Sequence, residues 1–259
     1  KESQLIIDYP AKDGYVLYRF LIQKDKNFLW NLYLNEYSLA DKLKEFDALL
    51  ELNSVVTVIN SNEVFLKALE FIENFNIIAL DTETFPLKPI IDGVEQPKAI
   101  TTLSLLQLCV SEQSSFLDRE NKRKFCFVVD LTANINMEFM KSILVSNKFV
   151  KVIHNAQYDV NIIQSNKGIL LDNVWCTMVA ERVNLNSEKG LKLANLAQRH
   201  LNIEMDKAMQ HSEWHIRPLS EEQFVYSVLD STILRDLYDS QVYKKYENGC
   251  EFHITSFKV

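Results

Sequence analysis

The chain has 259 residues, of which 47% are apolar and 24% charged, and its formal net charge is -7 at pH 7. These proportions are ordinary for a globular protein with a substantial core, and the low Gly and Pro counts, five each, exclude collagen-like and low-complexity architectures. The negative charge argues against a surface that binds phosphate everywhere, but it is compatible with a local site.

No apolar run reaches the length of a membrane span, and no basic and apolar leader opens the sequence. We therefore expect a soluble intracellular protein without a membrane partner, or one whose targeting segment lies outside these residues. The four cysteines include no C-x-x-C pair. They are expected to be reduced thiols rather than a zinc site or a disulfide framework.

Residues 1–53 carry no motif with a chemical meaning. We expect them to form a structural lead-in, with a strand over 14–22 and a helix over 39–52. The main domain is predicted to span residues 54–259, because no convincing boundary follows residue 54.

The main domain is predicted to begin with strands and to end with helices. Three strands joined by hairpins, followed by strands that alternate with helices, indicate an α/β fold with a mixed sheet flanked by helices. A loop is expected over 86–97, and the chain is expected to be helical from residue 156 almost to its end. The other elements expected are strands over 55–59, 77–83, 101–110, 125–130 and 149–153, a helix capped by Ser61, helices over 137–146 and 221–238, and a polar hairpin tip over 112–124.

The stretch Ile77–Glu83 combines a short apolar run with two acids, Asp81 and Glu83, spaced two apart. If the strand continues through Glu83, its period of two places both carboxylates on one face. Adjacent carboxylates repel each other and are costly to desolvate, so a hard divalent cation is their natural partner. Taken alone, the pattern fits a strand that exits into a solvated polar turn at least as well.

Two further pairs of polar residues have helical spacing. Asn155 is a plausible N-cap of a helix, and Asp159 follows one turn later. Tyr226 and Asp230 are spaced i, i+4 on the predicted helix over 221–238, so both can face one cleft. Each has a simple structural explanation, since Asp159 can complement a helix dipole and Tyr226 can be a half-buried core residue.

Together and in this order, Asp81-x-Glu83, Asn155-x-x-x-Asp159 and Tyr226-x-x-x-Asp230 resemble the DEDDy branch of the 3′–5′ exonucleases. This family includes the proofreading domains of family A DNA polymerases and the ribonuclease D group. The resemblance runs over about residues 55–246 and implies a ribonuclease H-like fold.

The resemblance also implies two divalent cations, Mg²⁺ or Mn²⁺. Asp81, Glu83 and Asp230 would hold the first ion, Asp81 would bridge to the second, and Asp159 would act through water. Tyr226 would orient the nucleophilic water rather than act as the principal base, since an ordinary phenol titrates near ~10.

Substrate contacts follow from the same resemblance. Thr84 and Leu87 would touch the terminal nucleotide, with Leu87 as a wedge against its base, and Asn155 would hold its sugar-phosphate. His154 is either a phosphate contact or a satisfied histidine at the strand end. Trp214 either stacks on a base or packs in the core, and His200, His211 and His215 receive no role.

The expected substrate is the single-stranded 3′ end of DNA, and the expected setting is the proofreading module of a family A polymerase, with a polymerase domain on the same parent chain. The richness in Asn, Lys and Ile suggests an AT-rich genome and an organellar location such as the apicoplast. Two alternatives stay open: a ribonuclease D-like enzyme that trims RNA, and a non-catalytic binding module of the same fold.

Overall fold

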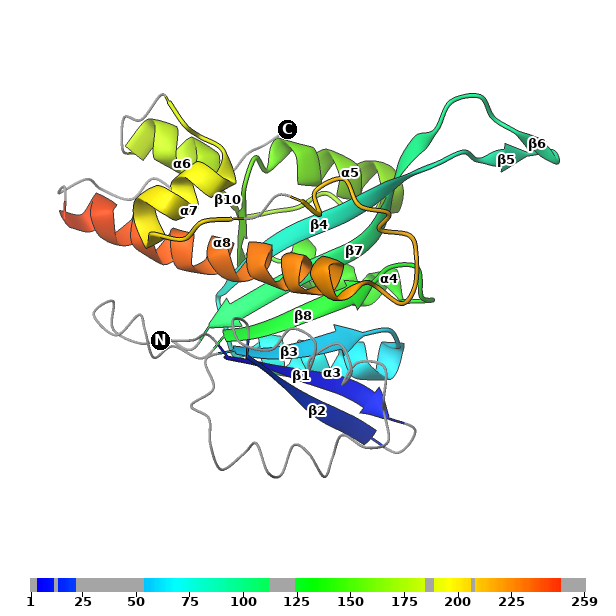
Figure 1. The fold of residues 1–259 in the computed structure, drawn as a ribbon, viewed down its shortest axis with the longest axis horizontal. Helices are drawn as coiled ribbons and strands as arrows, with labels where there is room; N and C mark the ends of the chain where they lie inside the picture. Colours follow the sequence, from blue (N-terminus) through cyan, green and yellow to red (C-terminus); the bar gives the residue numbers. More distant parts are fainter. Residues whose placement is uncertain are drawn as a thin grey trace.

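The computed structural model describes residues 4–11, 14–21, 54–111, 124–184, 189–205 and 208–247. Its centre is an eight-stranded sheet in the order β10-β9-β4-β7-β8-β3-β1-β2 (Figure 1). The strands are β1 (Gln4–Ala11), β2 (Gly14–Leu21), β3 (Ser54–Ile59), β4 (Ile77–Leu87), β7 (Ile100–Ser111), β8 (Lys124–Asp130), β9 (Val150–Ile153) and β10 (Val174–Cys176).

The sheet is mixed, as predicted. Strands β4, β7 and β8 are antiparallel neighbours, whereas β9 runs parallel to β4, β10 parallel to β9, and β3 parallel to β8. Strands β1 and β2 extend the sheet beyond β3, so it continues across residue 53, where we expect the main domain to begin. That division of the chain stays a prediction.

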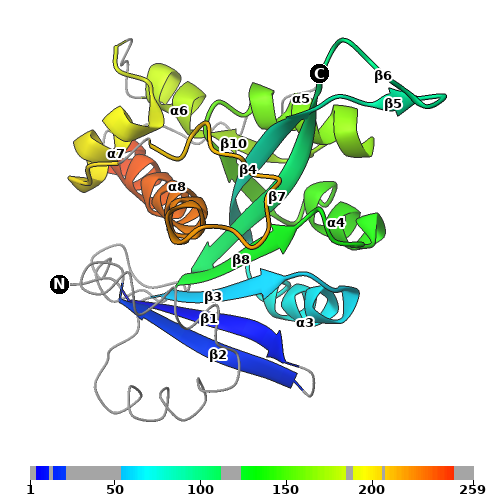
Figure 2. The ribbon, with the colours of Figure 1, turned by 45° about the vertical axis from the view of Figure 1, so that its right-hand side comes forward.

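Helices cover both faces of the sheet (Figures 1 and 2). The long helix α8 crosses one face in contact with β4, β7 and β8, and α3, α4 and α5 lie on the other. None of the helices in the described ranges is long and apolar enough to cross a membrane. The helices are α3 (Asn62–Ile72), α4 (Met137–Leu144), α5 (Gln157–Lys167), α6 (Thr177–Asn184), α7 (Leu193–Leu201) and α8 (Glu221–Glu247).

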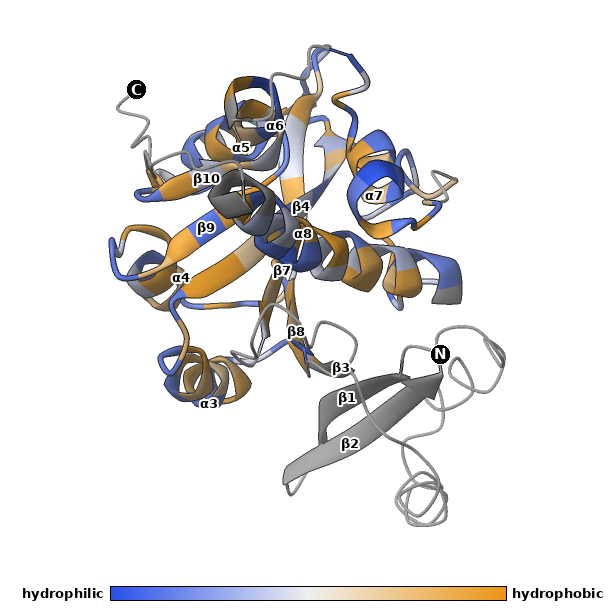
Figure 3. Ribbon diagram, turned by 90° about the vertical axis from the view of Figure 1, so that its left-hand side faces the viewer, coloured by the Kyte–Doolittle hydropathy of each residue, from blue (hydrophilic) through white to orange (hydrophobic). Residues whose placement is uncertain are grey.

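The central strands are rich in apolar residues (Figure 3), and those that the structure describes form two cores, one on each side of the sheet. Ile78 and Leu80 of β4 belong to the core under α3, α4 and α5, whereas Ala79 belongs to the core under α8. Successive side chains of β4 point to opposite faces of the sheet, so each polar residue farther along β4 faces either α8 or the helices on the other side.

Several predicted elements are confirmed. Ser61 is the N-cap of α3, and its hydroxyl accepts a 3.4 Å hydrogen bond from the backbone N–H of Val64. The strand over 14–22 is found as β2, and the predicted helix at 221 is found as the longer α8. The helix expected over 39–52 and almost all of the hairpin tip expected over 112–124 lie outside the described residues.

The prediction that Asn155 caps a helix is wrong. Helix α5 begins at Gln157, its N-cap position is Ala156, and no side chain caps it. Asn155 has φ 50, in the left-handed region that asparagine tolerates better than most residues. Its carbonyl accepts a 3.0 Å hydrogen bond from the N–H of Tyr158, so it forms a turn before the helix.

The segment over 86–97 is more regular than the predicted loop. Strand β4 continues to Leu87, still paired with β7, and a small hairpin of β5 (Ile90–Ile91) and β6 (Val94–Glu95) follows, forming a projecting arm (Figure 1). A proline at position 86 is compatible with the strand because β9 pairs with β4 only as far as Ala79.

The prediction of helix from residue 156 almost to the end misses β10, the edge strand of the sheet. Three apolar residues, Val174–Cys176, are too few for a period of two to be distinguished from a helical one.

Candidate active site

Three carboxylates meet between the sheet and α8. Oxygen atoms of Asp81, Glu83 and Asp230, one from each, all lie within 4.8 Å of one another. The register of β4 against β7 shifts only after Glu83, so Asp81 and Glu83 continue the face of Ala79, which is the face that α8 covers. Asp230 comes from α8 itself.

These carboxylates are in an unfavourable environment for their charge. Burial, reinforced by the charges of Asp81 and Asp230, raises the pKa of Glu83 to about 10. Burial also raises the pKa of Asp81 to about 6. The pKa of Asp230 is raised well above its ordinary value, first by burial and then by the charge of Asp81. No positively charged side chain in the described part of the chain forms an ion pair with them.

Asp159 lies on the other side of β4, outside the group of three. Thr82 alternates with Asp81 and Glu83, and its hydroxyl donates a 2.6 Å hydrogen bond to Oδ1 of Asp159. Burial and the charge of Asp81 raise the pKa of Asp159 well above its ordinary value. The fourth acid is therefore close enough to Asp81 to repel it, but it reaches the site from α5.

Tyr226 lies one turn before Asp230 on α8, as predicted, and both side chains line the same cavity. Burial and the nearby carboxylates raise the pKa of the Tyr226 phenol. Its ring lies 6.0 Å from the indole of Trp214, measured between centroids. Trp214 is 1% exposed and belongs to the core under α8, so packing rather than base stacking describes it.

All four acids and Tyr226 line one open cavity of about 940 Å³. Of the predicted substrate contacts, Thr84, His154 and Asn155 also line it. Leu87 does not: it is 43% exposed at the end of β4 and is absent from the cavity wall. The residues of β4 that follow Glu83 in the cavity wall are Thr84, Phe85 and Pro86, after the register shift between Glu83 and Thr84.

His154 is held as a neutral ring. Burial lowers its pKa to about 4, and Nδ1 lies 2.9 Å from the hydroxyl of Thr177. These contacts describe a satisfied histidine at the end of β9 that borders the cavity.

Other cavity residues have no counterpart in the sequence prediction. Phe85 lines the wall, and its ring packs against His215 at 5.2 Å between centroids. Tyr158 lines it too, with its hydroxyl 3.2 Å from that of Thr84. The sequence signal available was an aromatic residue close to a motif acid: Tyr158 directly precedes Asp159, and Phe85 lies two residues after Glu83. Further members of the wall are Lys192, Gln210, His211 and Ser212.

A second polar group lies among α6, α7 and α8, and its members do not line the cavity. Glu181 accepts hydrogen bonds from Arg199 at 2.6 Å and from Gln241 at 3.2 Å, and lies 2.8 Å from Nε2 of His200. Nδ1 of His200 lies 3.1 Å from the hydroxyl of Ser240. The serine, histidine and glutamate follow one another as in a hydrolytic triad, but Ser240 is 0% exposed, so no substrate can reach its hydroxyl.

The donor set fits a divalent cation. Clustered carboxylate oxygens are the ligands that Mg²⁺ and Mn²⁺ prefer, whereas zinc favours nitrogen and sulfur. A cation also accounts for three close carboxylates, two buried and one half-buried, that no described lysine or arginine neutralises, because it would lower the free energy of their charged forms.

Comparison with known proteins agrees with this geometry. Ribonuclease D of Bartonella henselae is 25% identical over 171 residues, which cover 66% of this chain and 37% of that protein. Human exosome complex component 10 is 30% identical over 125 residues, covering 48% of this chain and 14% of that protein. The chain thus spans well under half the length of either relative.

A solved structure shares the fold. Escherichia coli RNase D superposes with a TM-score of 0.58 at 20% sequence identity, covering 74% of this chain and 45% of that one. The family model described as 3′–5′ exonuclease matches residues 56–241, well over half of the sequence. The chain therefore belongs to the DEDDy-type 3′–5′ exonucleases, a family of metal-dependent nucleases with a ribonuclease H-like fold.

Proposed function

We propose that this chain removes nucleotides from the 3′ end of single-stranded RNA by hydrolysing the terminal phosphodiester bond with the help of two divalent cations. The observation that carries the proposal is the buried cluster of Asp81, Glu83 and Asp230 in a cavity that also holds Asp159 and Tyr226. RNA is favoured over DNA because the relatives described above are ribonuclease D and exosome component 10.

Mg²⁺ or Mn²⁺, when bound, supplies positive charge that stabilises the attacking and leaving oxygens of such a displacement. Asp81, Glu83 and Asp230 would hold one ion, and Asp81 would be shared with the second. Thr82 donates a hydrogen bond to one oxygen of Asp159, and Asp159 would act through water rather than hold an ion directly.

Tyr226 would position the attacking water. Its pKa is raised, so the phenol keeps its proton at neutral pH and can donate a hydrogen bond but cannot act as a base. Its place one turn before Asp230 on α8 puts the ring beside the acids in the cavity wall. Thr84 and Asn155 border the same cavity and would contact the terminal nucleotide.

DNA proofreading was the expectation from the sequence, and it remains the competing outcome. The relatives give no support to a polymerase domain on the parent chain, to a role in DNA replication or to an apicoplast location. The acids and Tyr226 do not separate the two substrates, because that choice depends on how the pocket treats the 2′-hydroxyl.

Matched 5′-labelled single strands, one RNA and one DNA, test the proposal in Mg²⁺ and in Mn²⁺. We expect a ladder of shortened RNA and slower shortening of DNA, with both lost in Asp230→Asn. Shortening of DNA alone would replace the RNA assignment with proofreading. Metal-dependent stabilisation without shortening of either strand would favour the non-catalytic binding module.

A further inference from the structure

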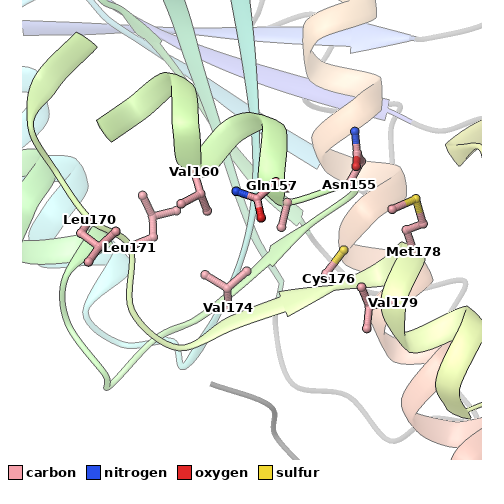
Figure 4. Close-up of a pocket in the computed structure, with 10 residues that line it drawn as sticks. Asn155, Gln157, Val160, Leu170, Leu171, Val174, Cys176, Met178 and Val179 are labelled. Atoms are coloured by element: carbon pink, nitrogen blue, oxygen red, sulfur yellow. The ribbon is translucent and has the colours of Figure 1, made fainter. Parts of the chain in front are cut away.

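A second, smaller cavity lies beside the catalytic one. Its volume is about 150 Å³, it is partly open to solvent, and residues of α5, β10 and the start of α6 line it (Figure 4). Asn155 and Met178 line both cavities, so they form the wall between them. The four acids and Tyr226 line only the larger one.

The walls of this side cavity are mostly apolar, and Asn155 and Gln157 are the polar side chains among them. Val160 of α5, Leu171 before β10, Val174 of β10 and Val179 of α6 point into it (Figure 4). Among the described residues, no charged side chain lines it. A cavity of about this volume has room for a single benzene-sized ring. The side cavity therefore fits one uncharged ring and excludes a phosphate.

The shared wall carries a free hydrogen-bonding group. The side-chain amide of Asn155 makes no hydrogen bond to any residue that the structure describes, and it lines both cavities. A carboxamide both donates and accepts, which matches the alternating donors and acceptors on the edge of a pyrimidine base. A hydrocarbon ring would leave this amide unused.

We propose that the side cavity is a binding site for a pyrimidine base, with the valine and leucine side chains packing on the ring and Asn155 bonding its edge. The base can come from the strand held in the catalytic cavity, in which case the inference rests on the proposed function. It can also be a free base, which requires no nuclease activity. Both sources present the same ring chemistry to the same wall.

Fluorine NMR of the full chain in Mg²⁺ tests the site with two probes, free 5-fluorouracil and a short strand that carries one 5-fluorouridine and a hydrolysis-resistant phosphorothioate at its 3′ end. We expect saturable broadening or shift of at least one fluorine resonance. Val179→Phe places a ring in the cavity from its half-buried rim and should weaken that binding at least tenfold.

Val183→Phe is the matched control, because Val183 lies one turn farther along α6, is 66% exposed and does not line the cavity. It should bind the probe as the wild type does. A thermal melt reports whether Val179→Phe is folded. If it is not, Val174→Phe repeats the test, because it fills the cavity from strand β10 instead.

Response of free 5-fluorouracil supports a site open to free bases, and response of the strand alone supports a site for a base of the bound strand. No response from either probe, or a response equal in wild type and the two filled variants, would overturn the proposal. Shortening of the labelled strands is measured separately, so failure of the side cavity is distinguishable from failure of the nuclease function.

Discussion

The hydroxyl of Thr82 and Oδ1 of Asp159 lie 2.6 Å apart across the contact between β4 and α5. These residues are separated by 77 positions in the sequence, and neither is in the group of three close carboxylates. The hydrogen bond fixes the orientation of the one catalytic-cavity acid that reaches the site from the opposite face of the strand.

Replacing Thr82 tests this positioning role. Thr82→Val keeps the shape of the side chain but removes the donor, so we expect kcat to fall by roughly tenfold to a hundredfold with little change in KM. Thr82→Ser retains a hydroxyl and should recover most of the rate. Steady-state kinetics on a labelled strand in Mg²⁺ measures both, and a wild-type kcat in Thr82→Val would exclude the role.

Removing one carboxylate should abolish metal-dependent stabilisation. In the wild type, Mn²⁺ at about 100 times its Kd stabilises the folded state by about 2.7 kcal/mol. For a chain of this size, that raises Tm by roughly 5 to 10 °C. Asp81→Asn should show no such rise and no strand shortening, whereas Glu138→Gln, which changes an exposed acid of α4, should behave as the wild type. A full Mn²⁺ response in Asp81→Asn would contradict the assignment of the site.

The acidic cluster also predicts how stability depends on pH without metal. The pKa of Asp81 is about 6 and that of Glu83 about 10 in the folded protein, above their ordinary values of 3.8 and 4.5. The folded state then binds more protons than the unfolded chain, so the free energy of unfolding falls as pH rises from about 4 through these folded pKa values.

Urea unfolding in EDTA at about pH 5 and about pH 8 measures this effect. We expect the wild type to lose on the order of 2 kcal/mol between the two, and Glu83→Gln to lose clearly less. Equal losses in the two proteins would show that the cluster does not cause the pH dependence.

Substitutions of Phe85 and Leu87 distinguish two ways in which the terminal base could be held: by stacking on Phe85, or by Leu87 as a wedge. Phe85 lines the cavity and packs on His215, whereas Leu87 is exposed beyond it. Base stacking on an aromatic ring contributes about 1–3 kcal/mol, so Phe85→Ala should raise KM by roughly tenfold. Leu87→Ala should change KM less than about twofold; a larger effect of Leu87 would restore the wedge role that the sequence suggested.

Glu181 should stabilise the fold without serving catalysis. Hydrogen bonds from His200 and Arg199 outweigh its burial and lower its pKa to about 2. Glu181→Gln should therefore lower the free energy of unfolding by about 3 kcal/mol at neutral pH. Because the pKa of Glu181 is lowered in the folded state, its contribution to the free energy of unfolding is complete above the ordinary value of 4.5 and is lost as pH falls toward about 2. The difference in the free energy of unfolding between wild type and Glu181→Gln should therefore shrink in acid.

Urea unfolding over this pH range, with Glu222→Gln as the control for an exposed acid at the start of α8, measures the difference. A Glu181→Gln variant that is as stable as wild type but has lost its nuclease rate would instead place Glu181 in the catalytic machinery.

The sequence by itself determined what depends on local periodicity. The alternation of β4 places Asp81 and Glu83 on one face, the turn of α8 aligns Tyr226 with Asp230, and Ser61 marks the start of α3. Each of these relationships spans at most four residues, so the geometry of a single strand or helix fixes it.

Only the tertiary structure decided which elements meet. The packing of α5 on one face of β4 and of α8 on the other separates Asp159 from the three close carboxylates and gives it Thr82 as a partner. The left-handed turn at Asn155, the edge strand β10 and the wall formed by Phe85 follow from the same packing. Such contacts join residues far apart in the sequence. A local sequence pattern predicts a single helix or strand, but it does not specify how two of them pack against each other.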